Sequence, residues 1–310
     1  MIRDRRVVIT GGAGFIGSHI AEALAPANDV TVLDDFSSGN EENLTGFGVR
    51  ILRGSVTRMS HLALAFRGAE LVFHLAARPS VPASVADPAG SERVNLGGTL
   101  NVLSAANEAG VRKVVFSSSC AVYGEAAPPV RESAPPMPMS PYAVHKLASE
   151  HYCRIFFELY GLRTVSLRYF NVFGPRQDPG SQYAAVVPVF FRDLLKKGRL
   201  TIYGDGRQTR DLIYVGDVVR ANLLAAERPA ADGKVLNIAT GHGTSVNGLA
   251  RLVARVLGKP LRTRRAPRRK GDIRHSRADI SAARRLLGFA PKVGLEDGLG
   301  RFYSAFPPAF

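Results

Sequence analysis

Three residues near the middle of the chain have the types and spacing of a proton-transfer group: Ser119, Tyr142 and Lys146. Ser119 ends an apolar run that predicts a strand, so its hydroxyl is expected at the carboxyl edge of a sheet. Ser140 and Pro141 are a typical N-cap and first residue of a helix. Tyr142 and Lys146 are four residues apart, so they share one face of that helix.

This group predicts a specific chemistry. A phenol with a pKa near 10 is a poor base at neutral pH, but an ammonium group one turn away and a nearby nicotinamide cation both favour the phenolate. Such a tyrosine can remove a proton from a hydroxyl while the same carbon gives hydride to NAD⁺. A Tyr-x-x-x-Lys pair is common by itself, so the interpretation requires a dinucleotide site earlier in the chain.

The start of the chain supplies that site. Residues 7–10 are a β-branched run that breaks into Gly11, Gly14 and Gly17 and reopens as an apolar helix. Three-residue spacing suits a tight turn after a strand, a close approach of backbone to a pyrophosphate, and a helix packed tightly on its strand. These glycines therefore predict a dinucleotide-binding turn.

A second strand pattern, residues 30–33, ends in Asp34. An acidic residue at this distance from the glycines can accept hydrogen bonds from the adenosine ribose. Residues 35–39 contain no arginine that could bind a 2′-phosphate. The sequence therefore favours NAD over NADP.

The chain has 310 residues, of which 45% are hydrophobic, enough for one large α/β domain or for a large and a small one. No apolar stretch approaches the roughly twenty residues of a membrane span, and the N-terminus leads directly into the first strand without room for a signal peptide. The two cysteines, Cys120 and Cys153, indicate no disulfide framework and no metal-ligand spacing. These features predict a reduced, cytoplasmic enzyme.

The chain has a net charge of +15, and its densest basic stretch is residues 262–274. Nucleic-acid binding is one explanation, but no interleaved aromatic residues or recognition motif accompany the arginines. Binding of a small polyanion such as a nucleotide diphosphate is another, and a solvated basic surface is the third. We favour the small polyanion.

Strands and helices alternate in the first half, which is typical of a parallel sheet covered on both faces. The predicted strands are 6–10, 30–33, 49–53, 71–74, 114–118 and 164–168, and the predicted helices are 16–24, 59–66, 94–109 and 142–160. After Asn171 the pattern changes to helices 186–197, 218–226, 244–257 and 280–287 and strands 200–203, 210–214 and 235–238.

We therefore predict an α/β fold: a doubly wound parallel (Rossmann-type) sheet with a smaller C-terminal substrate-binding region. The NAD-binding domain is expected to span 1–170, with 212–240 returning to it. The substrate-binding region is expected to comprise 171–211 and 241–310.

The segment 10–18 and the Ser119, Tyr142 and Lys146 group resemble the extended short-chain dehydrogenase/reductase superfamily in its nucleotide-sugar epimerase branch. The resemblance implies catalysis by these three residues. It also implies an NAD site, formed by Gly11, Gly14, Phe15, Ile16, Gly17, Asp34, Ser55, Val56, Leu75, Ala76, Ala77, Asn95, Tyr142 and Lys146. It further implies a site for a uridine diphosphate (UDP) sugar, formed by Ser119, Tyr142, Asn171, Arg210, Arg269, Asp272 and Ser276.

Two positions narrow the reaction that the resemblance implies. Dehydratases and decarboxylases of the superfamily carry acidic residues where this chain has Cys120 and Ala121, so 4-epimerisation is the simplest cycle. Ser276 stands where a tyrosine would block an acetamido group at sugar carbon 2. We therefore expect activity on UDP-GlcNAc and UDP-GalNAc, with UDP-glucose and UDP-galactose as further substrates.

Two alternatives stay open: a UDP-glucuronate 4-epimerase, given the arginines, and a non-catalytic dinucleotide-binding regulator. Ser55 stands where the family usually has an aspartate that accepts a hydrogen bond from the adenine amine, and a serine accepts that bond more weakly. The resemblance also implies a homodimer formed through two helices of each subunit, without nucleic-acid or membrane partners.

Overall fold

The computed structural model describes residues 2–178, 185–268 and 273–306. Within them, a seven-stranded parallel sheet has the order β11-β6-β5-β4-β1-β2-β3. Its strands are β1 (Arg6–Thr10), β2 (Asp29–Asp34), β3 (Arg50–Arg53), β4 (Leu71–His74), β5 (Lys113–Ser119), β6 (Arg163–Tyr169) and β11 (Lys234–Ile238). The order of the first six is that of a dinucleotide-binding sheet, with the reversal between β1 and β4.

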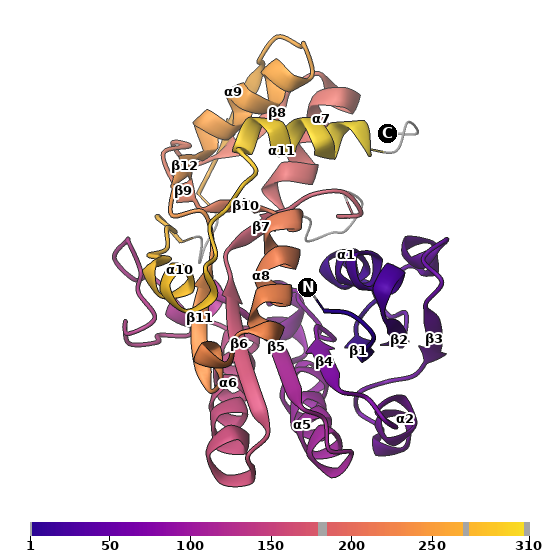
Figure 1. The fold of residues 1–310 in the computed structure, drawn as a ribbon. Helices are drawn as coiled ribbons and strands as arrows, with labels where there is room; N and C mark the ends of the chain where they lie inside the picture. Colours follow the sequence, from indigo (N-terminus) through magenta and orange to yellow (C-terminus); the bar gives the residue numbers. More distant parts are fainter. Residues whose placement is uncertain (1, 179–184, 269–272, 307–310) are drawn as a thin grey trace.

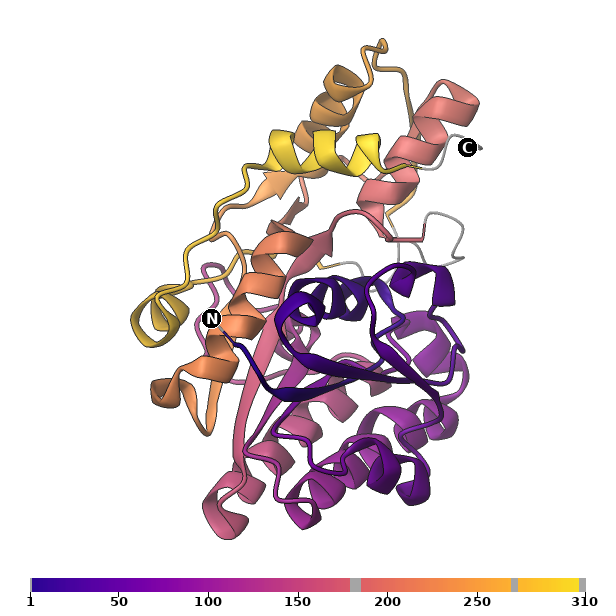
Figure 2. The ribbon, with the colours of Figure 1, turned by 45° about the vertical axis from the view of Figure 1, so that its right-hand side comes forward.

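Helices cover both faces of this sheet because each strand is apolar on both sides. Val7 and Ile9 of β1 pack into one core cluster, and Val8 packs into the other. One face carries α1 (Phe15–Leu24), α8 (Val215–Glu227) and α10 (Ser281–Leu287), and the other carries α2 (Met59–Ala65), α5 (Gly98–Glu108) and α6 (Pro141–Tyr160) (Figure 1, Figure 2). The predicted doubly wound α/β fold is confirmed.

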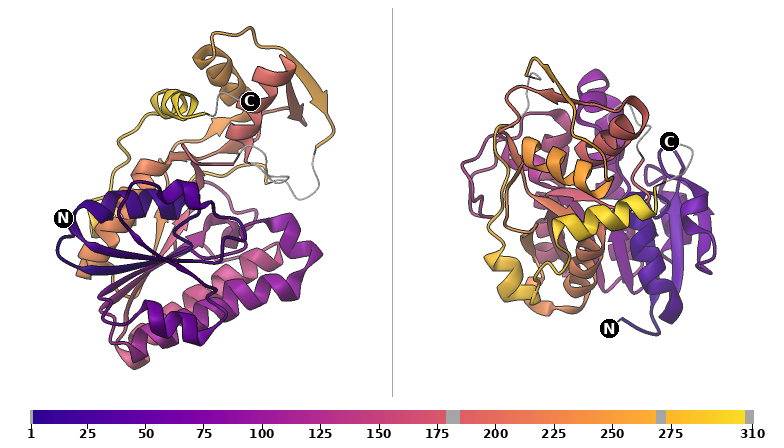
Figure 3. Two further views of the ribbon diagram at one scale, coloured as in Figure 1. Left: turned by 90° about the vertical axis from the view of Figure 1, so that its right-hand side faces the viewer. Right: turned by 90° about the horizontal axis from the view of Figure 1, so that it is seen from above.

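A smaller layer lies above the carboxyl edge of the sheet (Figure 3). Its core includes Phe190, Phe191, Leu249, Val253 and Phe302. Its helices are α7 (Val186–Lys197), α9 (Val246–Val256) and α11 (Leu295–Ser304). Its strand pairs are β8 (Leu200–Tyr203) with β13 (Thr263–Ala266), β7 (Asn171–Phe173) with β10 (Leu212–Tyr214), and β9 (Thr209–Arg210) with β12 (Thr244–Ser245).

Several short elements were not predicted. They are η1 (Ala25–Ala27), η2 (Glu41–Leu44), α3 (Val81–Ala86), α4 (Pro88–Glu92), η4 (Cys120–Tyr123) and η5 (Pro229–Ala231). Neither β13 nor α11 was predicted, because Thr263–Ala266 is largely exposed and arginine-rich and Leu295–Ser304 contains two glycines. The exposed strand has little apolar periodicity, and the two glycines lower the helix propensity of α11 although Leu295, Leu299 and Phe302 recur at helical spacing.

Two predicted elements have different boundaries. The helix predicted over 94–109 begins as a π-helical segment, η3 (Arg93–Gly97), and continues as α5. The strand predicted over 210–214 is two strands interrupted at Asp211. The Asp211 carboxylate is fully buried. It accepts hydrogen bonds from the backbone N–H groups of Thr240, Gly241 and Ala278 and from the Thr240 hydroxyl. Asp211 therefore joins its own segment to those of Thr240 and Ala278 instead of continuing the strand.

Candidate active site

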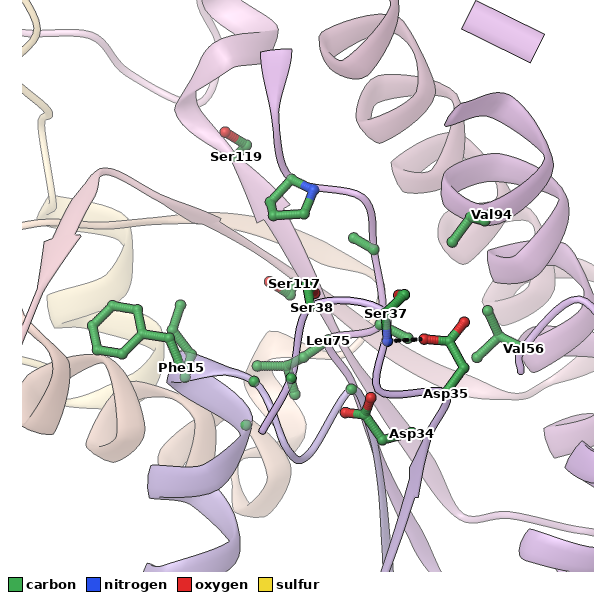
Figure 4. A pocket seen from close by; sticks show the side chains of 18 of the residues that line it. Phe15, Asp34, Asp35, Ser37, Ser38, Val56, Leu75, Val94, Ser117 and Ser119 are labelled. Atoms are coloured by element: carbon green, nitrogen blue, oxygen red, sulfur yellow. Dashed lines mark hydrogen bonds between the residues drawn. The ribbon is translucent and has the colours of Figure 1, made fainter. Parts of the chain in front are cut away.

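A cavity of about 430 Å³ opens at the carboxyl edge of the sheet, beside the point where the strand order reverses. Figure 4 shows Ser119 at one end and Asp34 at the other, with Phe15 on one side and Val56 and Val94 on the opposite side. Ligands of open α/β sheets bind at this position. The cavity volume lies within the range of small-molecule and cofactor sites.

The turn between β1 and α1 leaves room for a ligand close to its backbone. Gly11 has a φ of +70°, and a Cβ there would lie 2.5 Å from the backbone nitrogen of Ala76. A Cβ on Gly17 would lie 2.2 Å from the carbonyl oxygen of Gly11. Gly14 is the N-cap of α1 and carries no side chain to occupy the first N–H groups of the helix. The turn therefore fits a pyrophosphate at the positive end of the helix dipole.

Asp34 ends β2 inside the cavity and is 7% exposed. Its carboxylate accepts hydrogen bonds from the N–H groups of Ala13 (2.9 Å) and Phe36 (2.8 Å). Burial raises the pKa of Asp34, and these two hydrogen bonds oppose the rise. Each oxygen keeps a further lone pair, so the carboxylate is placed to accept ribose hydroxyls.

An arginine does lie near this end of the cavity. The Arg53 guanidinium is 4.3 Å from the centre of the Phe36 ring and forms an ion pair with Glu41 at 3.2 Å. It is not part of the cavity lining. The neighbourhood of Asp34 therefore still favours an unphosphorylated ribose.

Ser119, Tyr142 and Lys146 come together at the other end of the cavity. Ser119 is the last residue of β5, and its hydroxyl accepts a hydrogen bond of 3.2 Å from the N–H of Ala121. Ser140 caps α6 as the sequence predicts, accepting from the N–H of Ala143 at 3.2 Å. The helix begins directly after this cap, and Tyr142 and Lys146 lie one turn apart on it. Their side chains therefore enter the cavity from one helix face.

Burial dominates the proton affinities of this group in the ligand-free protein. It raises the pKa of Tyr142 to about 12, opposed by a hydrogen bond with Ser119. It lowers the pKa of Lys146 to about 8, opposed by Cys153 and Glu150. Without the nicotinamide charge, burial of Tyr142 therefore outweighs any acidifying effect of the lysine. The positive charge of an oxidised nicotinamide is the remaining contribution that would favour a phenolate.

A buried ion pair lies directly behind the group and was not predicted. Glu150 is one helical turn beyond Lys146, and its carboxylate accepts from Arg168 of β6 at 2.8 and 2.6 Å. The Ser118 hydroxyl also donates to Glu150, and the Arg168 guanidinium is 4.5 Å from the centre of the Tyr123 ring. These contacts hold β5, β6 and α6 in register, so they fix Ser119 relative to Tyr142. The only signal in the sequence is the spacing of four between Lys146 and Glu150.

Most residues of the predicted NAD site line the cavity, but Asn95 does not. Asn95 is 1% exposed, accepts from the Arg78 N–H at 2.7 Å and donates to the Arg78 carbonyl at 3.1 Å. Its amide therefore supports the loop after β4 from behind. The resemblance implies a cofactor contact for Asn95, and that role stays a prediction.

His74 performs a similar supporting role beneath Leu75–Ala77. Its ring is hydrogen-bonded to the hydroxyls of Thr10 (2.7 Å) and Thr99 (3.0 Å). Burial lowers the pKa of His74 to about 3, so the ring is neutral at physiological pH. Because Thr10 immediately precedes Gly11, this network fixes the glycine turn against the end of β4.

Of the predicted sugar-nucleotide residues, Ser119 and Tyr142 line the cavity, whereas Asn171, Arg210 and Ser276 lie outside its lining, on the side of the smaller layer. Asn171 donates to the Asp211 carbonyl at 3.1 Å, and Arg210 donates to the Thr209 carbonyl at 2.8 Å. The N–H of Ser276 donates to the same Thr209 carbonyl at 3.1 Å, so these residues gather around β9. The Ser276 hydroxyl contacts the Cys120 thiol, next to Ser119. Arg269 and Asp272 lie outside the described residues.

The cavity lining also contains residues that were not predicted. They come from β2, η3, β5, β6 and β7 and from the segments that follow β2, β3, β4, β6 and β7: Leu33, Asp35, Ser37, Ser38, Gly39, Gly54, Pro79, Val94, Ser117, Ser118, Tyr169, Phe170, Val172 and Asp178. Most have no chemical signature, and proximity in the fold alone identifies them. In the described ranges, no group of three or more His, Cys, Asp or Glu side chains could hold a metal ion, and no helix is long and apolar enough to cross a membrane.

Comparisons with known proteins agree with this geometry. The sequence model described as the NAD dependent epimerase/dehydratase family matches residues 7–239. The UDP-glucose 4-epimerase of Mycolicibacterium smegmatis is 40% identical over 310 residues, which cover 97% of this chain and 98% of that protein.

Solved structures give the same result. The UDP-N-acetylglucosamine 4-epimerase from Methanobrevibacter ruminantium, in complex with UDP-N-acetylmuramic acid, is 42% identical with a TM-score of 0.94 and covers 98% of both chains. The UDP-glucose 4-epimerase from Thermotoga maritima, with UDP-glucose, is 42% identical with a TM-score of 0.93. That match covers 97% of this chain and 98% of the other.

Proposed function

The chain belongs to the NAD dependent epimerase/dehydratase family, and we propose that it is a UDP-sugar 4-epimerase. The family and the NAD cofactor predicted from the sequence are confirmed. One observation carries the proposal: a single cavity has the glycine turn and Asp34 at one end and Ser119, Tyr142 and Lys146 at the other. The residues present fit NAD, because the turn excludes side chains and Asp34 offers acceptors.

NAD, when bound, supplies a hydride acceptor for sugar carbon 4 and returns the hydride to the opposite face of the 4-keto sugar. In our proposal the Tyr142 oxygen takes the proton from the 4-hydroxyl and later gives it back. Ser119 holds the same sugar oxygen by a hydrogen bond. Lys146 supplies positive charge beside Tyr142 and holds the three residues in place.

The surroundings of Ser119 support epimerisation over elimination or decarboxylation. Cys120 and Ala121 follow it, and burial raises the pKa of the Cys120 thiol to about 12. A neutral thiol and a methyl group cannot exchange a proton with sugar carbon 5 near neutral pH. The 4-keto sugar therefore has one productive route, which is reduction.

We propose that the region around β9, with Asn171, Arg210, Arg269 and Asp272, binds the UDP part of the substrate. We also propose that 171–211 and 241–310 form the substrate-binding region, except for α10, which packs on the large sheet. Arginine forks suit diphosphate oxygens, and a carboxylate suits ribose hydroxyls. We also propose a cytoplasmic homodimer that uses α5 and α6. On α6 the side chain of Val144 is 48% exposed, which an interface would bury.

For the sugar, we propose UDP-GlcNAc and UDP-GalNAc, with UDP-glucose and UDP-galactose also accepted. Support comes from the small side chain of Ser276 beside Cys120 and Ser119. The test is an assay of purified, NAD-loaded protein with each of these sugars and with UDP-glucuronate, with products resolved by NMR. Conversion of UDP-glucuronate alone would replace the proposed substrates, and no conversion of any UDP-sugar would overturn the proposed function.

A further inference from the structure

The segment that leaves the large sheet after β7 forms a braced turn beside the cofactor cavity. We call residues 174–178 the connector. The N–H of Gln177 donates to the Gly174 carbonyl at 3.3 Å, and its side-chain amide donates to the Val172 carbonyl at 3.2 Å. A Cβ on Gly174 would lie 2.4 Å from a methyl of Val215, so the turn also packs closely on the start of α8. Val172 and Asp178, on either side of this turn, line the cavity.

Arg176 ties the connector to the opposite wall. Its guanidinium forms an ion pair with Glu22 at 2.5 Å and donates to the Ser18 hydroxyl at 3.4 Å. The same guanidinium lies 5.1 Å from the centre of the Phe47 ring. Three contacts therefore converge on one side chain from a segment more than 120 residues away in sequence.

The backbone of Arg176 indicates that these contacts act on the connector. Its φ is +64°, a left-handed conformation that residues other than glycine adopt at an energetic cost. The Arg176 side chain is 22% exposed, so part of the ion pair is shielded from water. Contacts of this kind can hold a strained turn in place that would otherwise relax.

The partners of Arg176 are parts of the cofactor site's own scaffold. Ser18 and Glu22 belong to α1, whose first turn contributes Phe15, Ile16 and Gly17 to the cavity. Phe47 follows η2 and packs against the core that includes α1. The Arg176 contacts thus join α1 to the connector, and both segments contribute residues to the lining of the cavity.

We propose that Arg176 is a positioning residue that latches the connector onto α1 and thereby slows the release of NAD. In this proposal a dinucleotide leaves the cavity between the α1 turn and the connector, and separating them breaks the ion pair with Glu22 and the contact with Phe47. A cofactor that is reduced and reoxidised within one turnover gains from slow release, since loss of the reduced form would leave an oxidised sugar behind.

The test measures NAD release from the loaded protein. Parent, Arg176→Ala and Glu22→Ala are loaded with NAD and diluted into an NAD-degrading hydrolase, and the NAD still bound is measured over time. We expect release roughly 3- to 20-fold faster for Arg176→Ala, from loss of a partly shielded ion pair and a cation–π contact, and a smaller increase for Glu22→Ala. The double variant should release NAD no faster than Arg176→Ala alone, because both remove one interaction.

The matched control is another ion pair between elements, Arg255 of α9 with Glu296 of α11 at 3.3 Å, far from the cavity. Arg255→Ala and Glu296→Ala should leave NAD release unchanged. Release from Arg176→Ala within twofold of the parent would overturn the latch, as would equal acceleration by Arg255→Ala. If Arg176→Ala does not fold, unchanged NAD release from a folded Glu22→Ala variant is sufficient to overturn the latch.

A second measurement distinguishes impaired retention of NAD from a general loss of stability. With saturating NAD added, Arg176→Ala should recover turnover to within about threefold of the parent, since only retention is impaired. Turnover that stays low at saturating NAD would place Arg176 in the chemistry and overturn a role limited to retention. Because NAD release needs no sugar, this result is independent of the proposed substrate.

Discussion

The ammonium group of Lys146 donates a hydrogen bond of 2.6 Å to the backbone carbonyl of Ser117. The bond joins α6 to β5 two residues before Ser119. It leaves the ammonium 4.8 Å from the centre of the Phe116 ring and 5.9 Å from that of Tyr142. Lys146 therefore sets the distance between the helix that carries the phenol and the strand that carries the serine, besides bringing a positive charge to both.

Tyr142→Phe should fold and retain NAD but lose turnover by a factor on the order of 10²–10⁴, because only the proton-transferring hydroxyl is removed. Steady-state kinetics with the best UDP-sugar, together with NAD content, would check this. The control is Tyr160→Phe, at the exposed end of α6. Turnover of Tyr142→Phe within about threefold of the parent would remove Tyr142 from the mechanism.

Lys146→Met should stabilise the ligand-free protein at pH 7 while abolishing turnover. Burial lowers the pKa of Lys146 to about 8, so its charged form is disfavoured in the folded state. Below pH 8 Lys146 is protonated in both the folded and the unfolded chain, so the free-energy cost of burying its charge does not change with pH. Between pH 8 and about 10.5 the folded state has lost the proton that the unfolded state keeps, so the cost falls as pH rises.

Urea unfolding of parent and Lys146→Met at pH 7, 8, 9 and 10 measures this difference. We expect relief of the buried charge to outweigh loss of the hydrogen bond to the Ser117 carbonyl, so the variant should be more stable by on the order of 1–2 kcal/mol at pH 7, with the gap narrowing above pH 8. The comparison with the variant removes contributions from other titrating groups. A gap that is constant with pH would show that the lysine keeps its ordinary pKa.

The sequence was sufficient to predict the parts of this protein that depend on local pattern. The strand 6–10, the Ser140–Pro141 helix start and the glycine turn follow from β-branching, capping and spacing, and the structure has each of them. Contacts between distant segments were not predictable. Nothing near Arg176 in sequence indicates Glu22, and Asn95 resembles a cofactor ligand although its amide binds Arg78.

The same limit applies to the electrostatics. The spacing of Tyr142 and Lys146 correctly places them on one helix face, but a pKa depends on how deeply the surrounding fold buries each group. Burial comes from the packing of α6 on β5 and β6, with Glu150 and Arg168 behind them. A prediction from spacing alone therefore identifies the residues but not the effect of burial on the pKa of the Tyr142 phenol.

Asp34→Arg should weaken NAD binding and shift preference toward NADP, because a ribose acceptor becomes a partner for a 2′-phosphate. The change also removes the acceptor for the N–H groups of Ala13 and Phe36, so some loss of stability is expected. Asp34→Asn is the control that keeps one acceptor and adds no positive charge for a phosphate. Binding constants for NAD and NADP measured by calorimetry decide the outcome, and equal NAD affinity in parent and Asp34→Arg would place the ribose elsewhere.

Ser276→Tyr should change which sugar is used without abolishing the chemistry. Ser276 is held by its N–H on the Thr209 carbonyl and contacts Cys120 beside Ser119, whereas Tyr142 and Lys146 lie on a different element. A phenol ring in that space is expected to clash with the acetamido group of UDP-GlcNAc and to leave room for the hydroxyl of UDP-glucose. Steric exclusion of this kind gives larger specificity ratios than added favourable contacts do.

The measurement is kcat/KM for both sugars in parent, Ser276→Tyr and Arg277→Tyr. Arg277 is the exposed neighbour of Ser276, so the third protein carries the same ring one residue along the chain. We expect Ser276→Tyr to lose UDP-GlcNAc activity by 10-fold or more, on the order expected for a steric clash, while UDP-glucose activity changes little. Arg277→Tyr should resemble the parent. Equal loss of both activities, or unchanged UDP-GlcNAc activity, would show that Ser276 does not face sugar carbon 2, and the proposed N-acetylhexosamine specificity would lose its support.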